Sequence, residues 1–545
     1  MIGITLTSST VQADDTAPPW DGGVNPDSTL GKFMANVGYG SIRGVVLFVN
    51  ALLLTPILIF GLGKEQFAVL ALVTLFLRYG FNGVFDLGLA AGLVRFFSRD
   101  FAVGDYNKIN RYFASGLLLY ALAGVLLLAV YRLVSSFVLP SLLGLHGQVN
   151  PAIDMALWHS LWVYVLLLLS NPFFALLMGV QKVHLSHAVG TVSLLIELIG
   201  VLVLRPFGVT LSRVVLVYAV GAILSTLLCV VLVRLNFPHL RLRMGYVSRR
   251  SIRELVHYTA RWSVTASTSL LAPVIDKLIL ARFVGLSSVA IYESAAKLVE
   301  ILKRATQLFL LPLFPLAGAM EPNQTKEQTQ VFYRRVFRAN LAISAGLYLI
   351  PATLTFGIAR IWLGPELSGP VGWTFLVLSI TAFILAVVGP AVSILAGTGN
   401  MRLLVTAGLI ALSLSVFLSS GLAKHFGFRG LLAGTALAYG GQGLTILAGL
   451  QHRKGFSLDL RSVLHVGGVA VGSAVAPGLI LVKVFGREVG ATKLVAMGIL
   501  SIGIYLLALL AFEENRKLIV SVIMHTRKMI AAWLIGRRAG EMSQA

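Results

Sequence analysis

Long apolar runs recur along this chain, and they limit what it can fold into more than any other feature. Runs of about 20 to 30 residues follow one another between residues 38 and 513, separated by short polar stretches. A helix of that length crosses the roughly 30 Å of hydrocarbon in a bilayer. Because the bilayer core offers no water to unpaired backbone groups, helices are the structure that such runs can form there. The sequence therefore predicts an all-α polytopic membrane protein.

The apolar windows place about fourteen transmembrane helices along the chain. We predict them at 38–60, 66–96, 110–138, 153–180, 185–206, 209–235, 252–283, 287–320, 330–358, 370–397, 400–421, 429–450, 461–484 and 492–513. The first six form one lobe, the next six form a second, pseudo-symmetric lobe, and two C-terminal helices are additional. A disordered cytoplasmic tail (1–37) precedes the N-terminal lobe (38–235), and a basic cytoplasmic connector (236–251) joins it to the C-terminal lobe (252–450). The two additional helices (461–513) and a basic amphipathic cytoplasmic tail (514–545) follow.

The composition agrees with the bilayer as the main solvent. Hydrophobic residues make up 57% of the chain and charged residues 12%, against roughly 25% charged residues in ordinary soluble domains. The net charge of +22 comes largely from basic residues that flank the apolar runs, and no zinc-ligand spacing or nucleic-acid-binding motif accompanies it. Nucleic acid is therefore not an expected partner. The single cysteine, Cys229, excludes a disulfide framework.

The distribution of Lys and Arg predicts the orientation, because basic loops stay on the cytoplasmic side. The connector is rich in arginine, whereas the loop at 140–150 contains neither Lys nor Arg. Both termini of this multi-pass membrane protein are therefore predicted to be cytoplasmic. After the last span, cations on one helical face and apolar residues on the other predict a helix on the membrane surface. A fifteenth span and a partner-binding helix are the alternatives.

The two halves of the chain also resemble each other. Gly63 and Ala68 follow the first span, and Gly285 and Ala290 follow the seventh with the same spacing. Internal repetition of this kind is typical of two-lobed transporters. Coincidence is the alternative, because tight turns that contain glycine are common between helices.

Ionisable residues inside the spans are the candidate functional residues, because a charge at the bilayer centre costs about 2.5 to 3.5 kcal/mol on insertion scales. The basic candidates for substrate binding are Arg43, Arg78, Arg261, Lys277, Lys297 and Arg304. The acidic candidates for ion coupling or structural pairing are Asp86, Glu197, Asp276, Glu293 and Glu300. Charges gather in spans one, two, seven and eight, the equivalent helices of the two halves, which predicts a water-filled cavity between the lobes. Arginine binds phosphate oxygens bidentately, so the cationic surplus favours a substrate with phosphate or another acidic group.

Each candidate also has a structural explanation. Arg43 and Arg304 could extend to the cytoplasmic headgroups. Asp86 could neutralise Arg78, and Glu197 could be a protonated acid that packs one helix on another. A stripe of alternating charge at steps of four, three and four can pair along its own helix, and it comprises Glu293, Lys297, Glu300 and Arg304.

Diffuse motifs in both halves carry a resemblance to a known family. They are Gly63 and Ala68 followed by Asp86, Leu87, Gly88, Leu89 and Arg95, and in the second half Asp276, Lys277, Gly285, Ala290, Tyr292 and Lys297. With these residues the chain resembles the bacterial polysaccharide exporters of the Wzx type, lipid-linked oligosaccharide flippases related in fold to MATE drug transporters and to the lipid II flippase. The resemblance implies two lobes around a cavity that opens alternately to either side of the inner membrane.

The same resemblance implies a substrate and partners. The substrate would be an undecaprenyl-diphosphate-linked oligosaccharide, exported for cell-surface polysaccharide such as lipopolysaccharide or exopolysaccharide. By position, Arg43, Arg78 and Arg261 match the family's basic cavity residues, which would hold the diphosphate. The two helices beyond the usual twelve would contact the polyprenyl tail. Membrane lipids, a glycan polymerase and assembly proteins are the further expected partners.

Three other classes of function compete with a flippase. A membrane glycosyltransferase or polymerase needs a large outer loop and paired acidic residues, which the sequence lacks, so no catalytic residue, metal site or cofactor is predicted. A MATE-like cation-coupled efflux antiporter is the main alternative, distinguished by whether acidic rather than basic residues control transport. A scaffold for glycan assembly has no need of charges inside its spans.

Overall fold

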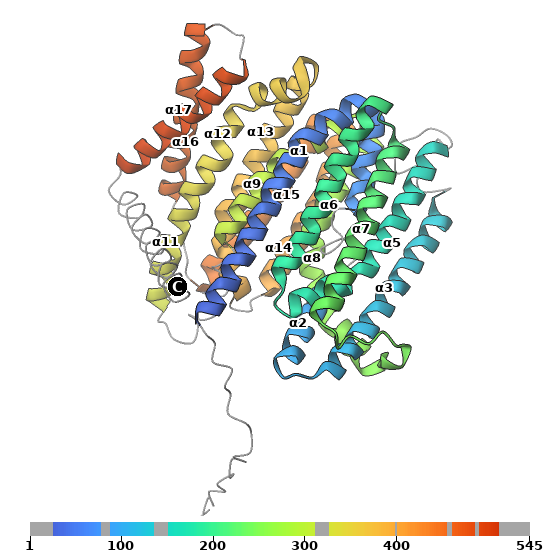
Figure 1. Cartoon of the computed structure of the whole chain (residues 1–545). Coiled ribbons are helices and arrows are strands. Elements are labelled where there is room, and N and C mark those ends of the chain that lie inside the picture. The colour runs from blue at the N-terminus through green and yellow to red at the C-terminus, as the bar shows by residue number, and fades with distance from the viewer. Residues whose placement is uncertain are drawn as a thin grey trace, which may run out of the picture.

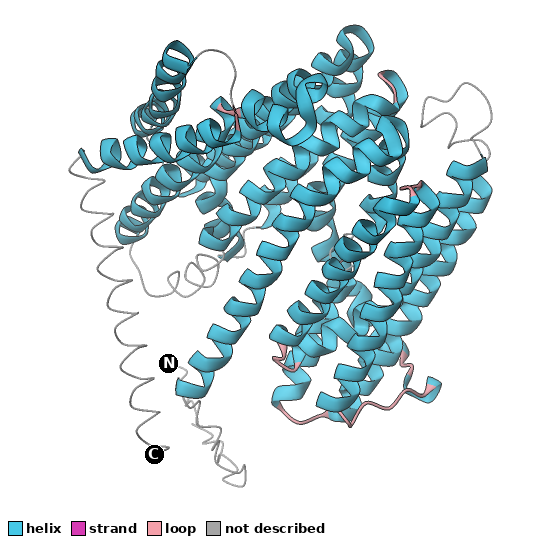
Figure 2. Cartoon of the chain, turned by 45° about the horizontal axis from the view of Figure 1, so that its top comes forward, coloured by secondary structure: helices cyan, strands magenta, loops and turns pink. Residues whose placement is uncertain are grey.

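Every regular element that the structure describes is a helix (Figures 1 and 2). The computed structural model describes residues 26–77, 88–135, 151–310, 326–397, 401–454, 460–485 and 490–511. The helices of the first lobe are α1 (Pro26–Leu77), α2 (Leu89–Ala102), α3 (Tyr106–Val134), α5 (Pro151–Gly179), α6 (Val183–Leu204), the 3-10 turn η1 (Arg205–Phe207) and α7 (Leu211–Asn236). A connector with the 3-10 turn η2 (Met244–Tyr246) leads to the second lobe.

The second lobe begins with two long helices and ends with a hairpin that contains a π-helix. Its elements are α8 (Arg249–Phe283), α9 (Leu286–Leu310), α11 (Lys326–Ser344), the π-helix η3 (Ala345–Leu349), α12 (Ile350–Thr353), α13 (Thr355–Gly397), α14 (Met401–Leu414), the π-helix η4 (Ser415–Ser419) and α15 (Ser420–Lys454). The two additional helices are α16 (Leu460–Phe485) and α17 (Ala491–Ala511). The predicted all-α fold of two six-helix lobes and two further helices is confirmed.

Tight turns at glycines let neighbouring spans join with almost no loop. The backbone of α1, α13 and α15 is interrupted at Gly63, Gly364 and Gly427, each with a positive φ that residues with a Cβ rarely adopt. Gly208 and Gly285 have positive φ in the turns after α6 and α8. We call this end of the bundle the glycine end, and the opposite end, with the connector and the turn between α2 and α3, the basic end (Figure 1). Within the described residues, nine helices are long and apolar enough to cross a membrane.

The structure differs from the predicted boundaries near the N-terminus. α1 begins at Pro26, inside the tail predicted to extend to residue 37, because proline is favourable in the first helical turn, where its missing N–H is not needed. The span predicted at 66–96 contains the end of α1 and the start of α2, and Gly88, with φ +76°, precedes α2. The remainder of the N-terminal tail and the C-terminal tail at 514–545 lie outside the described residues.

The arrangement of the lobes follows from the contacts of α1 and α8. α1 packs against α6 of its own lobe and against α9 of the second lobe, so it lies between the two groups of helices in Figure 1. α8 contacts α2 and α3 near its start, and α9, α14 and α15 over its later part. In the described part of the chain, α16 and α17 pack against α11, η3, α12 and α13 of the second lobe.

Polar side chains complete the backbone hydrogen bonds that irregular helices leave open. Pro390 in α13 has no N–H for the carbonyl of Ala386, one turn earlier, and the buried Asn340 of α11 donates to that carbonyl at 2.7 Å. The π-helix η3 interrupts the regular pattern of α11, and Tyr505 of α17 donates its hydroxyl to the carbonyl of Ala342 at 2.6 Å. Such partners are needed where water is absent.

Candidate functional site

A buried carboxylate lies where four elements of the second lobe meet. Asp276 of α8 is fully buried, and it accepts hydrogen bonds from the hydroxyl of Tyr292 on α9 at 2.9 Å and from Ser415 of η4 at 3.1 Å. The hydroxyl of Thr435 on α15 also lies beside this carboxylate. A buried acid in a membrane protein is costly unless it has such partners, and it is by default a candidate functional group.

The π-helix η4 gives this cluster its shape. Its wider turn carries Ser415 at its start and Ser419 at its end, both buried, and the Ser419 hydroxyl has no hydrogen-bond partner among the described residues. α15 approaches closely, because a Cβ on Gly434 would lie 2.5 Å from the Cα of Ser419. One carboxylate among several hydroxyl oxygens is chemistry that suits a proton or a hard cation, and π-helical turns often occur at functional sites.

The next residue on each helix forms a second link between α8 and α9. The Nζ of Lys277 lies 2.6 Å from the Oε2 of Glu293, and the two side chains are only 6% and 12% exposed. Two of the predicted site residues are therefore brought together as a buried ion pair. In this arrangement the positive charge of Lys277 is compensated within the second lobe.

Lys297, one turn further along α9, contacts the first lobe instead. Its ammonium donates to the hydroxyl of Thr55 on α1 at 3.3 Å, and it lies over the ring of Phe67 at 4.9 Å from the centroid. Lys297 therefore joins the lobes, within reach of the interface at which substrate binding was predicted.

Arg304 and Arg43 lie together near the basic end of the interface. Arg304 of α9 pairs with Glu300 at 3.4 Å, with both side chains about half exposed. Arg43 of α1 is solvent-exposed and within electrostatic range of Arg304. Its guanidinium packs on α6, because a Cβ on Gly190 would lie 2.8 Å from its Cζ. The structure thus places two arginines from different lobes within electrostatic range of each other.

Several predicted site residues are not placed by these contacts. Arg78 and Asp86 lie outside the described residues. Arg261 is on α8, but its side chain is also outside what the structure describes. Glu197 is half-buried on α6, the helix that packs against α1. The assignment of these four residues to the site stays a prediction.

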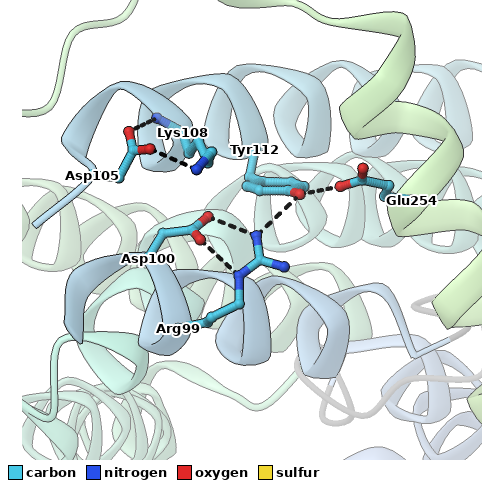
Figure 3. Close-up of polar contacts among 6 residues, drawn as sticks. All are labelled: Arg99, Asp100, Asp105, Lys108, Tyr112 and Glu254. Atoms are coloured by element: carbon cyan, nitrogen blue, oxygen red, sulfur yellow. Dashed lines mark hydrogen bonds and ion pairs between the residues drawn. The ribbon is translucent and has the colours of Figure 1, made fainter. Parts of the chain in front are cut away.

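A polar network at the basic end was not predicted (Figure 3). The hydroxyl of Tyr112 on α3 donates to Glu254 on α8 and accepts from Arg99 of α2 at 3.4 Å. Arg99 also makes two hydrogen bonds to the buried Asp100. Tyr112 and Glu254 are 142 residues apart in the sequence, so no local periodicity could have shown that they meet.

The connector is held against the same end of α3. The buried Asn110 donates to the carbonyl of His239 and accepts from the backbone N–H of Arg241, at 3.1 and 2.9 Å. Further along, the N–H of Ser248 donates to Ser115 at 3.2 Å. α3 begins at a cap made by Asp105, whose carboxylate accepts from the backbone N–H of Lys108 at 2.9 Å.

The chain is similar in sequence to one protein family and to one curated relative. A family model described as polysaccharide biosynthesis protein matches residues 33–320, just over half of the chain. A curated relative, "Uncharacterized membrane protein EpsK" of Bacillus subtilis (strain 168), is 24% identical over 343 residues. That alignment covers 62% of this chain, which spans 66% of the relative's length.

Solved structures share the fold at low sequence identity. The lipid II flippase MurJ in an inward closed conformation matches with a TM-score of 0.72 at 12% identity, over 89% of this chain and all of that one. An inward-facing multidrug resistance MATE family transporter of the MOP superfamily matches with a TM-score of 0.64 at 13% identity, over 77% of this chain and 98% of that one. At these identities the likeness shows the arrangement of helices and nothing finer.

Proposed function

This chain belongs to the family of polysaccharide biosynthesis proteins, and on that premise we propose that it flips an undecaprenyl-diphosphate-linked oligosaccharide across the bacterial cytoplasmic membrane. The transport would proceed by alternating access of a cavity between the lobes, for the synthesis of a cell-surface polysaccharide. The basic end faces the cytoplasm in this proposal, as the arginine-rich connector favours.

The observation that carries the proposal is the pair formed by Arg43 and Arg304. Two like charges from opposite lobes lie within electrostatic range of each other, and the Arg304 side chain is about half exposed. Their repulsion is relieved by an anion bound between them, and a diphosphate offers oxygens to both guanidinium groups. Substrate binding would therefore draw the two lobes together at this level, which is a requirement of alternating access.

Energy for the movement is proposed to enter at Asp276. Its carboxylate, with the hydroxyls of Tyr292 and Ser415, joins α9 and η4, two elements that pack on α8. Binding or loss of a proton or cation at this position would change how those elements pack, and α8 also contacts the first lobe. Glu197 would be a second candidate for coupling, and Glu293 would be a structural partner of Lys277.

A MATE-like cation-coupled efflux antiporter is the second candidate. The observation that favours it is the buried carboxylate of Asp276, together with a helix arrangement shared with a MATE family transporter. In an antiporter of that kind the acidic residues would control the transport of a small organic cation. The exposed arginine pair would then have no ligand of matching charge.

Reconstitution into vesicles tests the proposal. We expect purified protein to flip a fluorescent polyprenyl-diphosphate oligosaccharide, and Arg43→Gln or Arg304→Gln to lower the rate about tenfold each, because one charged hydrogen bond contributes about 1.5–3 kcal/mol. Arg402→Gln, at an exposed arginine of α14, is the matched control. Unchanged flipping in both cavity variants would remove the arginines from the mechanism. Transport of an organic cation without any flipping would favour the antiporter.

A further inference from the structure

Pro56 leaves a carbonyl in the middle of α1 without its helical donor. In a regular helix the carbonyl of Leu52 accepts from the N–H of residue 56, which proline lacks. The indole of Trp362 on α13 donates to this carbonyl at 2.8 Å. The two residues are 310 positions apart and belong to different lobes.

The same stretch of α1 has three more contacts with the second lobe. Lys297 donates to Thr55 and lies over Phe67, as described above. Lys64, next to the turn at Gly63, forms an ion pair with Glu366, next to the turn at Gly364, at 2.5 Å. We call this set the glycine-end contact, and its residues are Leu52, Thr55, Lys64, Phe67, Lys297, Trp362 and Glu366.

The interactions in the glycine-end contact differ in the free energy that their loss would cost. The Lys64 and Glu366 side chains are 40% and 78% exposed, and exposed ion pairs contribute little. The Leu52 carbonyl is different, because its ordinary donor is missing and it lies inside an apolar helix. An unmade hydrogen bond at such a position is expensive.

A carbonyl in the second lobe also lacks its helical donor, but its replacement donor comes from the same lobe. Pro390 frees the carbonyl of Ala386, and the donor Asn340 belongs to the same lobe. That bond persists whichever way the lobes move. The bond from Trp362 to Leu52 crosses between lobes, so it can exist only while the lobes meet at the glycine end.

We propose that Trp362 and Pro56 together form a state-dependent hydrogen bond that holds the glycine end closed. Opening this end removes the indole from the Leu52 carbonyl, which must then find water. Closure is favoured for as long as the end stays dry, and entry of water into an opening cavity lowers the cost of separation. The inference rests on the proposed function only in that the lobes separate, and it does not depend on what is transported.

Distance measurements between spin labels test this proposal. The background is Cys229→Ala, which removes the single cysteine, with labels at the exposed positions Glu65→Cys on α1 and Arg360→Cys on α13. Electron double resonance then reports the separation of the lobes in detergent or nanodiscs. We expect Trp362→Phe, which keeps an aromatic ring and loses the donor, to raise the open fraction about fivefold, the effect of one typical hydrogen bond.

The matched control is Trp373→Phe. Trp373 lies on the same helix, is 58% exposed and makes an edge-to-face contact with Phe356, so the same substitution there should leave the distances unchanged. An open fraction in Trp362→Phe equal to that of the parent would overturn the proposal.

Pro56→Ala gives a second and sharper test. Alanine restores a backbone N–H for the Leu52 carbonyl, so in this background the indole bond is no longer needed. We expect Trp362→Phe to lose most of its effect when combined with Pro56→Ala. Additive effects of the two substitutions would overturn the proposal, because coupling through one carbonyl requires them to be non-additive.

Neither outcome depends on the substrate. A chain that opens as expected but flips no lipid-linked oligosaccharide would contradict the proposed function and leave the role of Trp362 intact. A chain that flips this lipid while Trp362→Phe changes no distance would do the reverse.

Discussion

Two pairs of neighbouring residues link α8 to α9 in different ways. Asp276 binds hydroxyl groups, whereas Lys277 binds a carboxylate, and their partners Tyr292 and Glu293 are also adjacent. The first link can change with the protonation or ligand state of one acid. The second is a closed ion pair, so its expected contribution is structural.

We expect removal of one member of the closed pair to be costly. Glu293→Gln leaves Lys277 buried without a counter-charge and should lower the free energy of unfolding by about 3–5 kcal/mol. Combined replacement with Lys277→Met and Glu293→Leu should recover most of that loss, because two apolar side chains of similar size need no partner. Thermal unfolding in detergent measures both. Equal destabilisation by the single and the double variant would contradict a mainly structural pair.

The cap of α3 should depend on pH. Hydrogen bonds from the side chain and backbone of Lys108 hold the pKa of the Asp105 carboxyl below its ordinary value, so its ionised form stabilises the helix start. That contribution is present above the ordinary aspartate pKa of about 3.9, and it is lost as the pH falls through the lowered pKa. We expect the protection of the amides at residues 106–109 against hydrogen exchange, relative to the intrinsic rate at each pH, to fall in that acid range.

Asp105→Asn is the control for this effect. Asparagine caps a helix about as well as aspartate and does not titrate, so exchange in the variant should show no such acid transition. The same acid transition in both proteins would assign it to another group.

At the scale of elements, irregular turns in the helices are matched by side chains from neighbours. The carbonyl of Ala342 in the last turn of α11, just before η3, accepts a hydrogen bond from the hydroxyl of Tyr505 on α17, and this hydrogen bond fixes where the last helix packs on the second lobe. Gly346 in η3 permits the approach, because a Cβ there would lie 2.8 Å from Tyr505 Cε1.

Gly346→Ala should therefore loosen the last two helices. We expect a cost of about 1–3 kcal/mol, typical of overpacking, and easier proteolysis in the segments around α16 and α17. Gly503→Ala is the matched control, since Gly503 lies on α17 with open space around it and alanine favours the helix. A Gly346→Ala variant as stable as the parent would show that η3 accommodates the added methyl group at no cost in stability.

At the scale of the whole molecule, α8 is shared between the lobes. Its start meets α2 and α3 through Tyr112, Glu254 and a stacking contact of Arg95 with Tyr258, whereas its end holds Asp276 in the second lobe. A change at one end of α8 can therefore alter contacts at the other.

Tyr112→Phe tests the contact at the start of α8. The variant loses hydrogen bonds to two charged groups, so we expect the buried position Thr259, replaced by cysteine in the Cys229→Ala background, to react with a maleimide about tenfold faster. Tyr246→Phe, at a half-buried tyrosine of the connector, should not change the rate. Equal rates in all three proteins would mean that Tyr112 does not hold this contact closed.

The sequence predicted the fold better than the site, for physical reasons. Hydropathy along the chain reports where helices cross lipid, so the spans and the two lobes could be predicted, and the charged stripe on α9 indicated the lobe interface. The sequence could not show that Lys277 meets Glu293, because this ion pair depends on how α8 and α9 pack. No sequence pattern marked Tyr112 or Trp362 as functional. The partner of Tyr112 lies 142 residues away, and the partner of Trp362 is a backbone carbonyl.

The glycine turns have a practical consequence for anyone who wants to capture the protein in one state. Among the described turns at the glycine end, those at Gly63, Gly285, Gly364 and Gly427 join helices almost directly, so an antibody or nanobody that recognises one of these turns must bind the helix tips beside it. Because those tips belong to both lobes, an epitope that includes Lys64 and Glu366 exists in one arrangement of the lobes, and binders selected against this end should discriminate between conformations.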